Sequence, residues 1–437
     1  MYLANLLPRR NVARWAMLLV LASGGSANAA CDPDNGGLTL PQGFCATVFA
    51  DEVGRARRVV AAPNGIVYVA NMARTGDGII ALHDTDGDGR ADRRGGFAPA
   101  GGGGLGVFGQ WLYYGLDDRI LRYRLPARGQ LEPAQAAQVV VRGFPQQRSH
   151  ATKTFSFDGD GHLYVNVGAP SNACQREARR PGVAGLDPCP QLERQAGIWR
   201  FDAARLEQTQ RGDGERYATG IRNAVANAWD PRTDKLYVVQ HGRDQLAELW
   251  PEHFTDEQRA ELPAEELFAV DANDDFGWPY CYYDPMVKAK RLSPEYGGDG
   301  DTLGRCERAE KPVVAFPAHW APNDIVFYGA DHFPAAYRHG AFIAFHGSWN
   351  RQPFSQEGFR VAFVPADEAG LSGRFEDFAT GFVGSERITS PGQARHRPAG
   401  LAIDSAGALY IADSTAGRIW RVTYQGSERT AATAEEH

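Results

Sequence analysis

Residues 401–413, with the sequence LAIDSAGALYIAD, decide the fold of this protein. The stretch reads as a short apolar strand, a turn that contains Asp, Ser and Gly, and a second strand of the type Leu-Tyr-Ile-Ala. Apolar residues that alternate on both sides of such a turn are typical of an antiparallel hairpin and not of a helix. One hairpin cannot bury both of its faces, so it must pack against other units.

The same unit recurs along the chain. Further copies are 59–71 (VVAAPNGIVYVAN), 105–115 (LGVFGQWLYYG), 155–168 (FSFDGDGHLYVNVG), 226–240 (ANAWDPRTDKLYVVQ) and a looser pair, 325–328 with 341–346. Several copies are followed by a third strand, at 120–123, 197–201, 268–271, 359–363 and 418–424. Six such units must stack, and radial stacking protects the edges of their sheets. We therefore predict an all-β fold, a six-bladed β-propeller with loop insertions over residues 31–424; a pair of β-sandwiches is the alternative.

The spacing between copies exceeds the ~40–50 residues of a bare blade, so the chain must contain insertions. They are visible at 171–195, 250–266 and 279–318. The acidic segment 251–267 favours a surface helix. In a propeller, we expect function in the loops at one mouth of the central channel, because a rigid scaffold holds functional loops.

The composition is that of an ordinary globular protein. Hydrophobic residues make up 43% of the 437 residues, charged residues make up 23%, and the formal net charge is −7. Without a basic excess, a nucleic acid is not an expected partner. The cysteines fall into neighbouring pairs, and we expect disulfides within these pairs because short loops close most easily, although the sequence permits other connectivities. The pairs are Cys31 with Cys45, Cys174 with Cys189, and Cys281 with Cys306.

The two ends of the chain are not expected to belong to the propeller. Three arginines between residues 9 and 14 precede the apolar run 15–22, which is too short to span a bilayer, and small residues follow. This pattern predicts a secretory signal peptide over residues 1–29 and a mature protein that is periplasmic or secreted, without a transmembrane segment. Residues 425–437 are expected to be a disordered tail.

Several loops carry Arg or His at the same offset, just before the first strand of a unit. A rotationally repeated scaffold would bring these loops to one rim. A neutral imidazole there can accept a proton from a hydroxyl, and arginines that face together favour an anionic ligand. The alternatives are a loop histidine that bonds a backbone carbonyl and a salt bridge between blades. The residues are Arg57, His150, Arg222, Asn223, Arg395 and Arg397.

Two further turns follow strands. In QHGRD (240–244), a glycine frees the carbonyls of Gly242 and Arg243 to bind a hard cation such as calcium, and a simple tight turn is the alternative. In HGSWNR (346–351), Trp349 can stack on a flat ligand or plug the space between blades. Asn350 and Arg351 offer hydrogen-bond donors beside it.

Residues 84–92, DTDGDGRAD, reproduce the first nine places of a calcium-binding loop. The twelfth place, Gly95, lacks the acid that usually completes such a loop, so we expect Asp92 to supply the last carboxylate. A solvated turn is the alternative to a structural calcium site. The expected ligands are Asp84, Asp86, Asp88, the carbonyl of Arg90, and Asp92.

The order and spacing of four motifs carry a resemblance to a known family. They are YATGIRN (217–223), FGWPYCY (276–282), AFIAFHGSWNR (341–351) and RPAGLAID (397–404). From about residue 38 to residue 424, the chain resembles the soluble, secreted sugar dehydrogenases that depend on pyrroloquinoline quinone (PQQ). These are six-bladed propellers, and the sorbosone and pyranose dehydrogenase branches are the most similar.

The resemblance implies roles for the loop residues. His150 corresponds to the general base that takes the proton of the sugar C1 hydroxyl while hydride passes to PQQ. Arg222, Asn223, Arg395 and Arg397 correspond to residues that contact the cofactor, and the carbonyls of Gly242 and Arg243 to those that hold calcium.

The sequence also departs from the family pattern. The loop 349–351 lacks a lysine that the glucose dehydrogenases have. The run 101–104 is four glycines where relatives often place Gln or His against the cofactor, and Ser149 stands where an acid precedes the base.

We therefore expect an exported enzyme that uses PQQ and calcium to oxidise the C1 hydroxyl of an aldose or sugar aldehyde to a lactone or acid. The sequence has no Cys-x-x-Cys-His haem motif, so the electron acceptor is expected to be external, a separate cytochrome or a quinone. A calcium-dependent propeller lactonase and a non-catalytic carbohydrate-binding propeller are the alternatives. Arginines rather than carboxylates in the loops favour the anionic cofactor.

Overall fold

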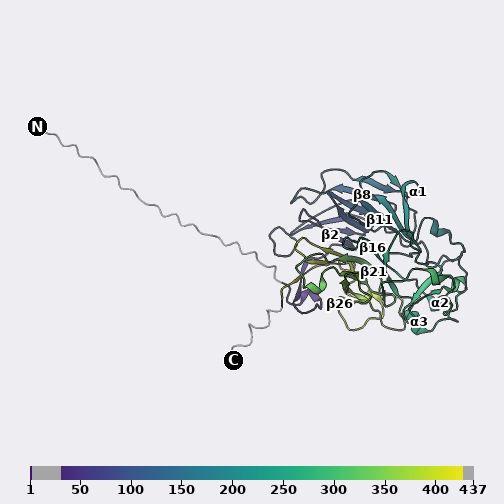
Figure 1. The fold of residues 1–437 in the computed structure, drawn as a ribbon. Coiled ribbons are helices and arrows are strands. Elements are labelled where there is room, and N and C mark those ends of the chain that lie inside the picture. Colours follow the sequence, from purple (N-terminus) through teal and green to yellow (C-terminus); the bar gives the residue numbers. More distant parts are fainter. Residues whose placement is uncertain (2–30, 427–437) are drawn as a thin grey trace, which may run out of the picture.

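The computed structural model describes residue 1 and residues 31–426. In this part of the chain, six sheets of four or five strands make up the body of the molecule, with two small two-stranded sheets beside them. Figure 1 shows these sheets gathered into one body, with the short helices α2 (Leu246–Leu249) and α3 (Asp256–Glu261) together at one side. The predicted signal peptide, apart from residue 1, and the predicted tail, apart from residues 425–426, lie outside the described residues.

Each large sheet is one blade, numbered here in chain order of its first strand. Blade 1 is β2 (Ala56–Ala61), β3 (Val67–Asn71), β4 (Ile79–His83) and β5 (Arg93–Phe97). Blade 2 is β6 (Gly104–Phe108), β7 (Trp111–Gly115), β8 (Arg119–Arg124) and β9 (Gln138–Arg142), with β13 (Gln208–Thr209) added at its edge. Blade 3 is β10 (Phe155–Phe157), β11 (His162–Val167), β12 (Gly197–Asp202) and β14 (Glu215–Thr219).

The second half of the chain forms three more blades. Blade 4 is β15 (Ala226–Asp230), β16 (Lys235–Gln240), β17 (Glu265–Val270) and β20 (Val314–Phe316). Blade 5 is β21 (Pro322–Phe327), β22 (Ala341–His346), β23 (Phe359–Val364) and β26 (Glu376–Ala379). Blade 6 is β27 (Pro398–Ile403), β28 (Leu409–Asp413), β29 (Ile419–Tyr424) and β1 (Phe44–Ala50).

The first strands of the six blades contact one another in a closed ring. The contacts run from β2 to β6, β10, β15, β21 and β27, and from β27 back to β2. A closed ring of first strands is the geometry of a propeller, so the six-bladed prediction is confirmed and the pair of sandwiches is wrong. The ring is closed by β1, which pairs antiparallel with β29 and places Phe44 opposite Tyr424.

The sequence pattern predicted the first two strands of every blade and the third strand of blades 2–6, but neither β4 of blade 1 nor any fourth strand. Strand β5, for example, has the sequence RRGGF and is exposed or half-buried, so no apolar alternation marks it. The helix predicted over 251–267 is present only as α3, which begins after the capping residue Thr255. From Glu265 the chain forms β17, because its backbone pairs with β16 and β20.

The insertions hold smaller elements. They are α1 (Gln210–Asp213), the hairpin β18 (Cys281–Asp284) with β19 (Ala289–Leu292), the pair β24 (Ala366–Asp367) with β25 (Gly370–Leu371), and 3₁₀ turns at Asn35–Gly37, Pro190–Glu193, Pro294–Tyr296, Gly304–Arg308, Ala335–Tyr337 and Pro391–Gln393. All three expected disulfides, Cys31–Cys45, Cys174–Cys189 and Cys281–Cys306, are present.

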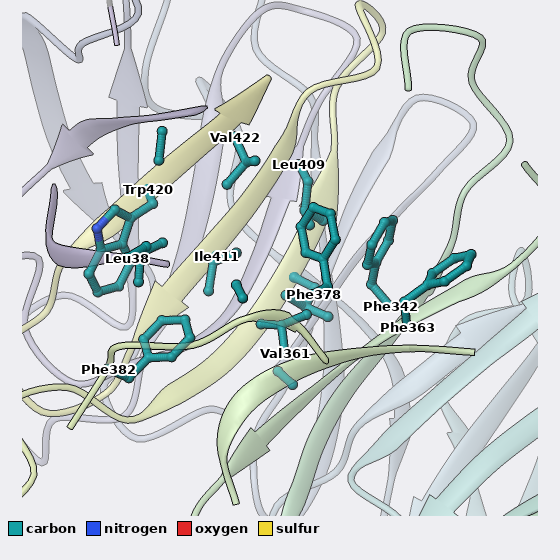
Figure 2. Packing of buried hydrophobic residues seen from close by; sticks show 14 of the residues in the cluster. Leu38, Phe342, Val361, Phe363, Phe378, Phe382, Leu409, Ile411, Trp420 and Val422 are labelled. Atoms are coloured by element: carbon teal, nitrogen blue, oxygen red, sulfur yellow. The ribbon is translucent and has the colours of Figure 1, made fainter. Parts of the chain in front are cut away.

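The core lies between adjacent blades. Between blades 5 and 6, Figure 2 shows the rings of Phe342, Phe363 and Phe378 on one side, and Leu409 and Ile411 on the other. The rings of Phe342 and Phe378 meet edge to face with centroids 4.6 Å apart. Such packing on both faces of every sheet explains why the second strands are nearly continuous apolar runs.

Candidate active site

The residues predicted to contact substrate or cofactor lie in loops at one end of the ring of first strands, whereas the aspartate loop 84–92 follows β4 at the opposite end of blade 1. Each first strand pairs antiparallel with its second strand, so the start of the first strand lies beside the end of the second. In blade 1, for instance, Ala56 is opposite Asn71, and in blade 6 Pro398 is opposite Asp413. The same pairing in all six blades brings their loops to one rim around the channel, which we call the rim below.

A buried ion pair joins two blades one residue along β2 from the rim residue Arg57. Arg58 of β2 crosses from blade 1 to blade 5, where its guanidinium pairs with the carboxylate of Asp324. The same guanidinium donates to the carbonyls of Val225, at 3.4 Å, and Asn227, at 3.3 Å, beside blade 4. Burial raises the pKa of Asp324 to about 6, although the charge of Arg58 opposes this shift. Neither Arg58 nor Asp324 was among the site residues predicted from the sequence.

Two rim arginines lie close enough for their charges to interact, and neither guanidinium has an ion-pair partner among the described residues. Arg57 contacts Oδ1 of Asn323 at 3.4 Å and Nε2 of His346 at 3.5 Å. Arg397 donates to the carbonyls of His346, at 2.9 Å, and Gly347, at 2.8 Å. Among the described residues, no carboxylate lies within ion-pair distance of either guanidinium. Burial lowers the pKa of each to about 10; for Arg57 the charge of Arg397 adds to the effect, and for Arg397 the charge of Asp413, which accepts from its backbone N–H at 2.7 Å, opposes it.

Polar side chains near these arginines keep unused hydrogen-bonding atoms. Nδ2 of Asn323 and Oδ1 of Asn350 are buried and have no partner in the described part of the chain. His346 shares a hydrogen bond of 2.6 Å with Ser414, and burial together with the charges of Arg57 and Arg397 holds its pKa well below the usual value. The rim therefore combines positive charge with neutral, unsatisfied polar groups.

His150 is held in one tautomer. Its Nδ1 lies 2.6 Å from the carbonyl oxygen of Ala169, which can only accept, so Nδ1 carries the proton and Nε2 keeps a lone pair. Burial and the charge of Arg222 lower the pKa of His150 to about 3. The alternative considered above, a loop histidine bonded to a carbonyl, describes the geometry correctly, and this bond also leaves Nε2 free to act as a base.

Arg222 is buried within a polar cluster. It forms an ion pair of 2.9 Å with Asp244 and donates to Asn172, at 3.1 Å, and to the carbonyl of Gly242, at 2.9 Å. Asp244 also accepts from Arg179 at 2.8 Å. Burial would raise the pKa of Asp244, but the charges of Arg222 and Arg179 hold it at about 2. The salt bridge that was left open for Arg222 is therefore present.

Asn223 and Gly242 lie next to these groups. Asn223 is buried, and its Oδ1 accepts from Asn166 at 3.3 Å. A Cβ on Gly168 would lie 2.6 Å from Cβ of His150 and 2.7 Å from Oδ1 of Asn223, so glycine lets these two residues approach. The backbone N–H of Gly242 donates to the buried carboxylate of Glu265 at 2.8 Å, which fixes this turn.

Several predicted residues lie apart from the cationic rim. Arg351 donates to the carbonyl of Ala260, at 2.6 Å, and to Glu261, at 2.7 Å, so it anchors its loop to α3. The side chain of Arg243 turns to a buried ion pair with Glu295 in the insertion. Arg395 is exposed, whereas Arg397 is half-buried.

The loop of Trp349 sits directly beside the Arg222 cluster. Its neighbour Asn350 reaches Oδ1 of Asp244 at 3.4 Å, while the indole of Trp349 is 50% exposed. Because half of Trp349 faces solvent, this residue does not plug the space between blades.

The aspartate loop gathers three of its predicted ligands. Carboxylate oxygens of Asp84, Asp86 and Asp88 lie within 4.8 Å of one another. Asp92 instead accepts from the backbone and hydroxyl of Thr85, which lowers its pKa. The side chain of Arg90 points away and donates to the carbonyl of Val48 at 3.0 Å.

Three of the four glycines in the run 101–104 have a steric cause, and at Gly101 the positive φ of 93° favours glycine instead. A Cβ on Gly102 would collide with the ring of Tyr114, one on Gly103 would lie 2.6 Å from Cγ2 of Thr152, and one on Gly104 would collide with the carbonyl of Lys153. Neighbouring residues of the same chain therefore leave no room for side chains at positions 102–104.

We expect Gly104→Ala to lower the free energy of unfolding by about 1–3 kcal/mol, because the backbone of residue 153 cannot move aside without disturbing the contact between blades 2 and 3. Denaturant unfolding measures the change. Gly159→Ala is the matched control, because a Cβ there has nothing within 4 Å. Equal stability of the two variants would contradict the steric explanation.

None of the helices within residues 31–426 has the length and apolar character needed to cross a bilayer. A family model described as TrAA12-like matches residues 38–425. Among curated relatives, a PQQ-dependent pyranose dehydrogenase of Coprinopsis cinerea is 26% identical over 234 residues, which are 46% of this chain and 30% of that protein. An uncharacterised protein of Borreliella burgdorferi is 26% identical over 219 residues, 48% of this chain and 49% of that protein. The chain thus matches half or less of the length of these relatives.

Solved structures share the fold. The holo PQQ domain of pyranose dehydrogenase from Coprinopsis cinerea has a TM-score of 0.70 at 19% identity, covering 88% of this chain and 97% of that one. A calcium structure of a Trichoderma reesei carbohydrate-active enzyme of family AA12 has a TM-score of 0.71 at 18% identity, covering 89% and 97%. The soluble aldose sugar dehydrogenase of Escherichia coli has a TM-score of 0.55 at 16% identity, covering 87% and 99%.

Proposed function

This chain belongs to the TrAA12-like family, which confirms the resemblance to the soluble PQQ-dependent sugar dehydrogenases, and on that premise we propose that it oxidises the C1 hydroxyl of an aldose or sugar aldehyde with PQQ as cofactor. The product is a lactone or acid. The observation that carries the proposal is a pair of arginines, Arg57 and Arg397, whose guanidiniums form no ion pair among the described residues, on the same rim as a neutral histidine whose Nε2 is available.

The residues of the rim fit a flat anionic group. Two half-buried guanidiniums without a carboxylate repel each other, and a bound carboxylate would relieve this repulsion with charge-assisted hydrogen bonds. The unused Nδ2 of Asn323 and Oδ1 of Asn350 can satisfy carbonyl and N–H groups of the same ligand. We assign Arg57 and Arg397 to the carboxylates of PQQ, with Asn223, Asn350 and the exposed Trp349 as further contacts.

His150 would act on the substrate. Its Nε2 accepts the proton of the C1 hydroxyl, and the bond from Nδ1 to Ala169 keeps the ring oriented while it does so. The charge of Arg222, which pairs with Asp244, lowers the pKa of His150 and so disfavours protonation of its ring in the free enzyme. When bound, PQQ supplies a quinone carbonyl that accepts hydride.

Calcium is proposed at two places. The carbonyl of Gly242 has a second lone pair beside the one that Arg222 uses, and with the carbonyl of Arg243 it can hold a cation that polarises the cofactor. The loop of Asp84, Asp86 and Asp88, with Arg90 and Asp92, is the proposed structural site. We further propose that the protein is exported and that its electrons pass to an external cytochrome or quinone.

Reconstitution tests the function. Purified protein is mixed with PQQ and Ca²⁺, an aldose is added, and the absorbance of the reduced quinone is followed. We expect reduction that depends on all three additions. The absence of reduced quinone with a panel of aldoses and sugar aldehydes, despite measurable PQQ binding, would show that this function is wrong.

We expect Arg57→Gln and Arg397→Gln each to raise the Kd for PQQ by about 10–100-fold, because one charge-assisted hydrogen bond contributes about 1.5–3 kcal/mol. Equilibrium titration of the PQQ absorbance measures the change. Arg374→Gln, which removes an exposed arginine of the loop before β26, is the control. An unchanged Kd in both rim variants would overturn the assignment of the anion site.

A further inference from the structure

A cavity of about 430 Å³ lies between two of the insertions, and none of the rim residues described above lines it. Its polar and aromatic lining comprises Asp187, Asp275, Tyr280, Arg305 and Arg308. The volume lies in the range of sites that bind small molecules. The cavity belongs to the segments 174–189 and 276–309, which a bare propeller blade does not need.

Disulfides hold both walls of this cavity in place. Cys174–Cys189 closes the loop that carries Asp187, and Cys281–Cys306 closes the loop that carries Arg305. The hydroxyl of Tyr280 accepts from the backbone N–H of Cys189 at 2.9 Å, so the two loops are joined to each other. A cavity with fixed walls needs little ordering when a ligand binds.

The charges of the lining indicate the class of ligand. Arg305 pairs with Asp187 at 3.2 Å, and its guanidinium stacks 4.2 Å from the centre of the Tyr280 ring. Arg308 is exposed, and the carboxylate of Asp275 is held by the N–H of Gly277 at 2.9 Å. Two carboxylates and two guanidiniums give no net charge but offer both acceptors and donors.

We infer that this cavity binds a neutral saccharide unit at a second site outside the channel. Sugar hydroxyls both donate and accept, so they can bond to the carboxylates and the guanidiniums without bringing a net charge, whereas a charged ligand would meet a like charge on one wall. The inference rests on the proposed function for the choice of a saccharide among neutral polyols.

The cavity is joined to the rim through short contacts. Gly220 leaves no room for a Cβ because the backbone of Phe276 and Gly277 lies against it. The indole N–H of Trp278 donates at 2.9 Å to the carbonyl of Asn172, and Oδ1 of Asn172 accepts from Arg222. The second site therefore lies on the side of the molecule that carries the rim.

Calorimetric titration of the full chain without PQQ tests the site, using the neutral trisaccharides cellotriose and xylotriose and the anionic trigalacturonate as probes. We expect one of the neutral probes to bind, and both Arg305→Ala and Arg308→Ala to raise its Kd at least tenfold. Arg374→Ala, an exposed arginine outside the cavity, is the matched control and should bind as the unchanged protein does.

The outcomes separate this inference from the proposed function. No binding of either neutral probe, equal Kd values in all variants, or stronger binding of trigalacturonate would overturn the second site. Because the titration uses protein without PQQ, these results do not depend on catalysis. If the protein binds the neutral probe through Arg305 and Arg308 but never reduces PQQ, the second site is supported and the proposed function is wrong.

Discussion

His150→Gln is expected to lower kcat by about 10²–10⁴-fold, the contribution that a positioned general base makes, while PQQ still binds. Gln retains an amide N–H that can reach the carbonyl of Ala169, but it has no basic nitrogen to replace Nε2. Stopped-flow reduction of bound PQQ by an aldose measures the loss. His162→Gln is the control, since His162 lies at the opposite end of β11 from the rim and bonds Asp158 at 2.7 Å.

The pH dependence gives a second check on His150. Its pKa is lowered to about 3, so the imidazole remains in the neutral, proton-accepting form as the pH falls from about 8 to about 5. We therefore expect no loss of kcat from protonation of this base in that range, and a loss only as the pH approaches the lowered pKa. An acid limb near pH 6.5 that disappears in the Gln variant would contradict the buried geometry.

Arg58→Met is expected to lower the free energy of unfolding by about 3–5 kcal/mol, because it leaves the buried carboxylate of Asp324 without its partner. Three backbone groups also bond to this ion pair. The N–H of Leu401 donates to Asp324 at 2.9 Å. Arg58 donates to the carbonyls of Val225 and Asn227. Chemical denaturation measures the change.

The pH and a second substitution distinguish charge from packing. The pKa of Asp324 is already raised in the folded protein, so its neutral form is favoured there more than in the unfolded chain. As the pH falls from about 8 to about 5, protonation of Asp324 should relieve part of the destabilisation in Arg58→Met. The double variant Arg58→Met with Asp324→Leu should recover part of the stability at pH 8. If the free energy of unfolding falls by the same amount at about pH 8 and at about pH 5, and the double variant recovers none of it, the effect of Arg58→Met comes from packing alone.

The strands of the propeller were predictable where burial on both faces repeats a pattern. The hairpin 401–413 coincides with β27 and β28, because every residue of β28 is buried and the turn between the strands is polar. The fourth strands have no such signal, since β5 and the exposed start of β26 face solvent. The predicted helix was too long because pairing of Glu265 and its neighbours with β20 overrides helix propensity.

The rim was predictable as a set of loops but not as a set of contacts. Four of its residues come just before the first strand predicted for their unit, and this shared offset correctly placed them at the same end of the ring. They are Arg57, His150, Arg222 and Arg397. The same offset did not show that Arg351 anchors α3 or that Arg395 is exposed, because each side chain responds to its own neighbours. Asn323 lay in no predicted motif, and Asp244 lay in the motif QHGRD but was not predicted as the partner of Arg222.

By itself, the sequence determined the six repeated units, the three disulfides and the end of the molecule where the polar loops gather, because each of these depends on residues close together in the chain. The tertiary structure decided which charges remain unpaired. Arg222 pairs with Asp244 and Arg58 pairs with Asp324, whereas the guanidiniums of Arg57 and Arg397 form no ion pair among the described residues. The physical reason is that an ion pair depends on distances of a few ångströms between blades, which closure of the ring sets and local sequence does not.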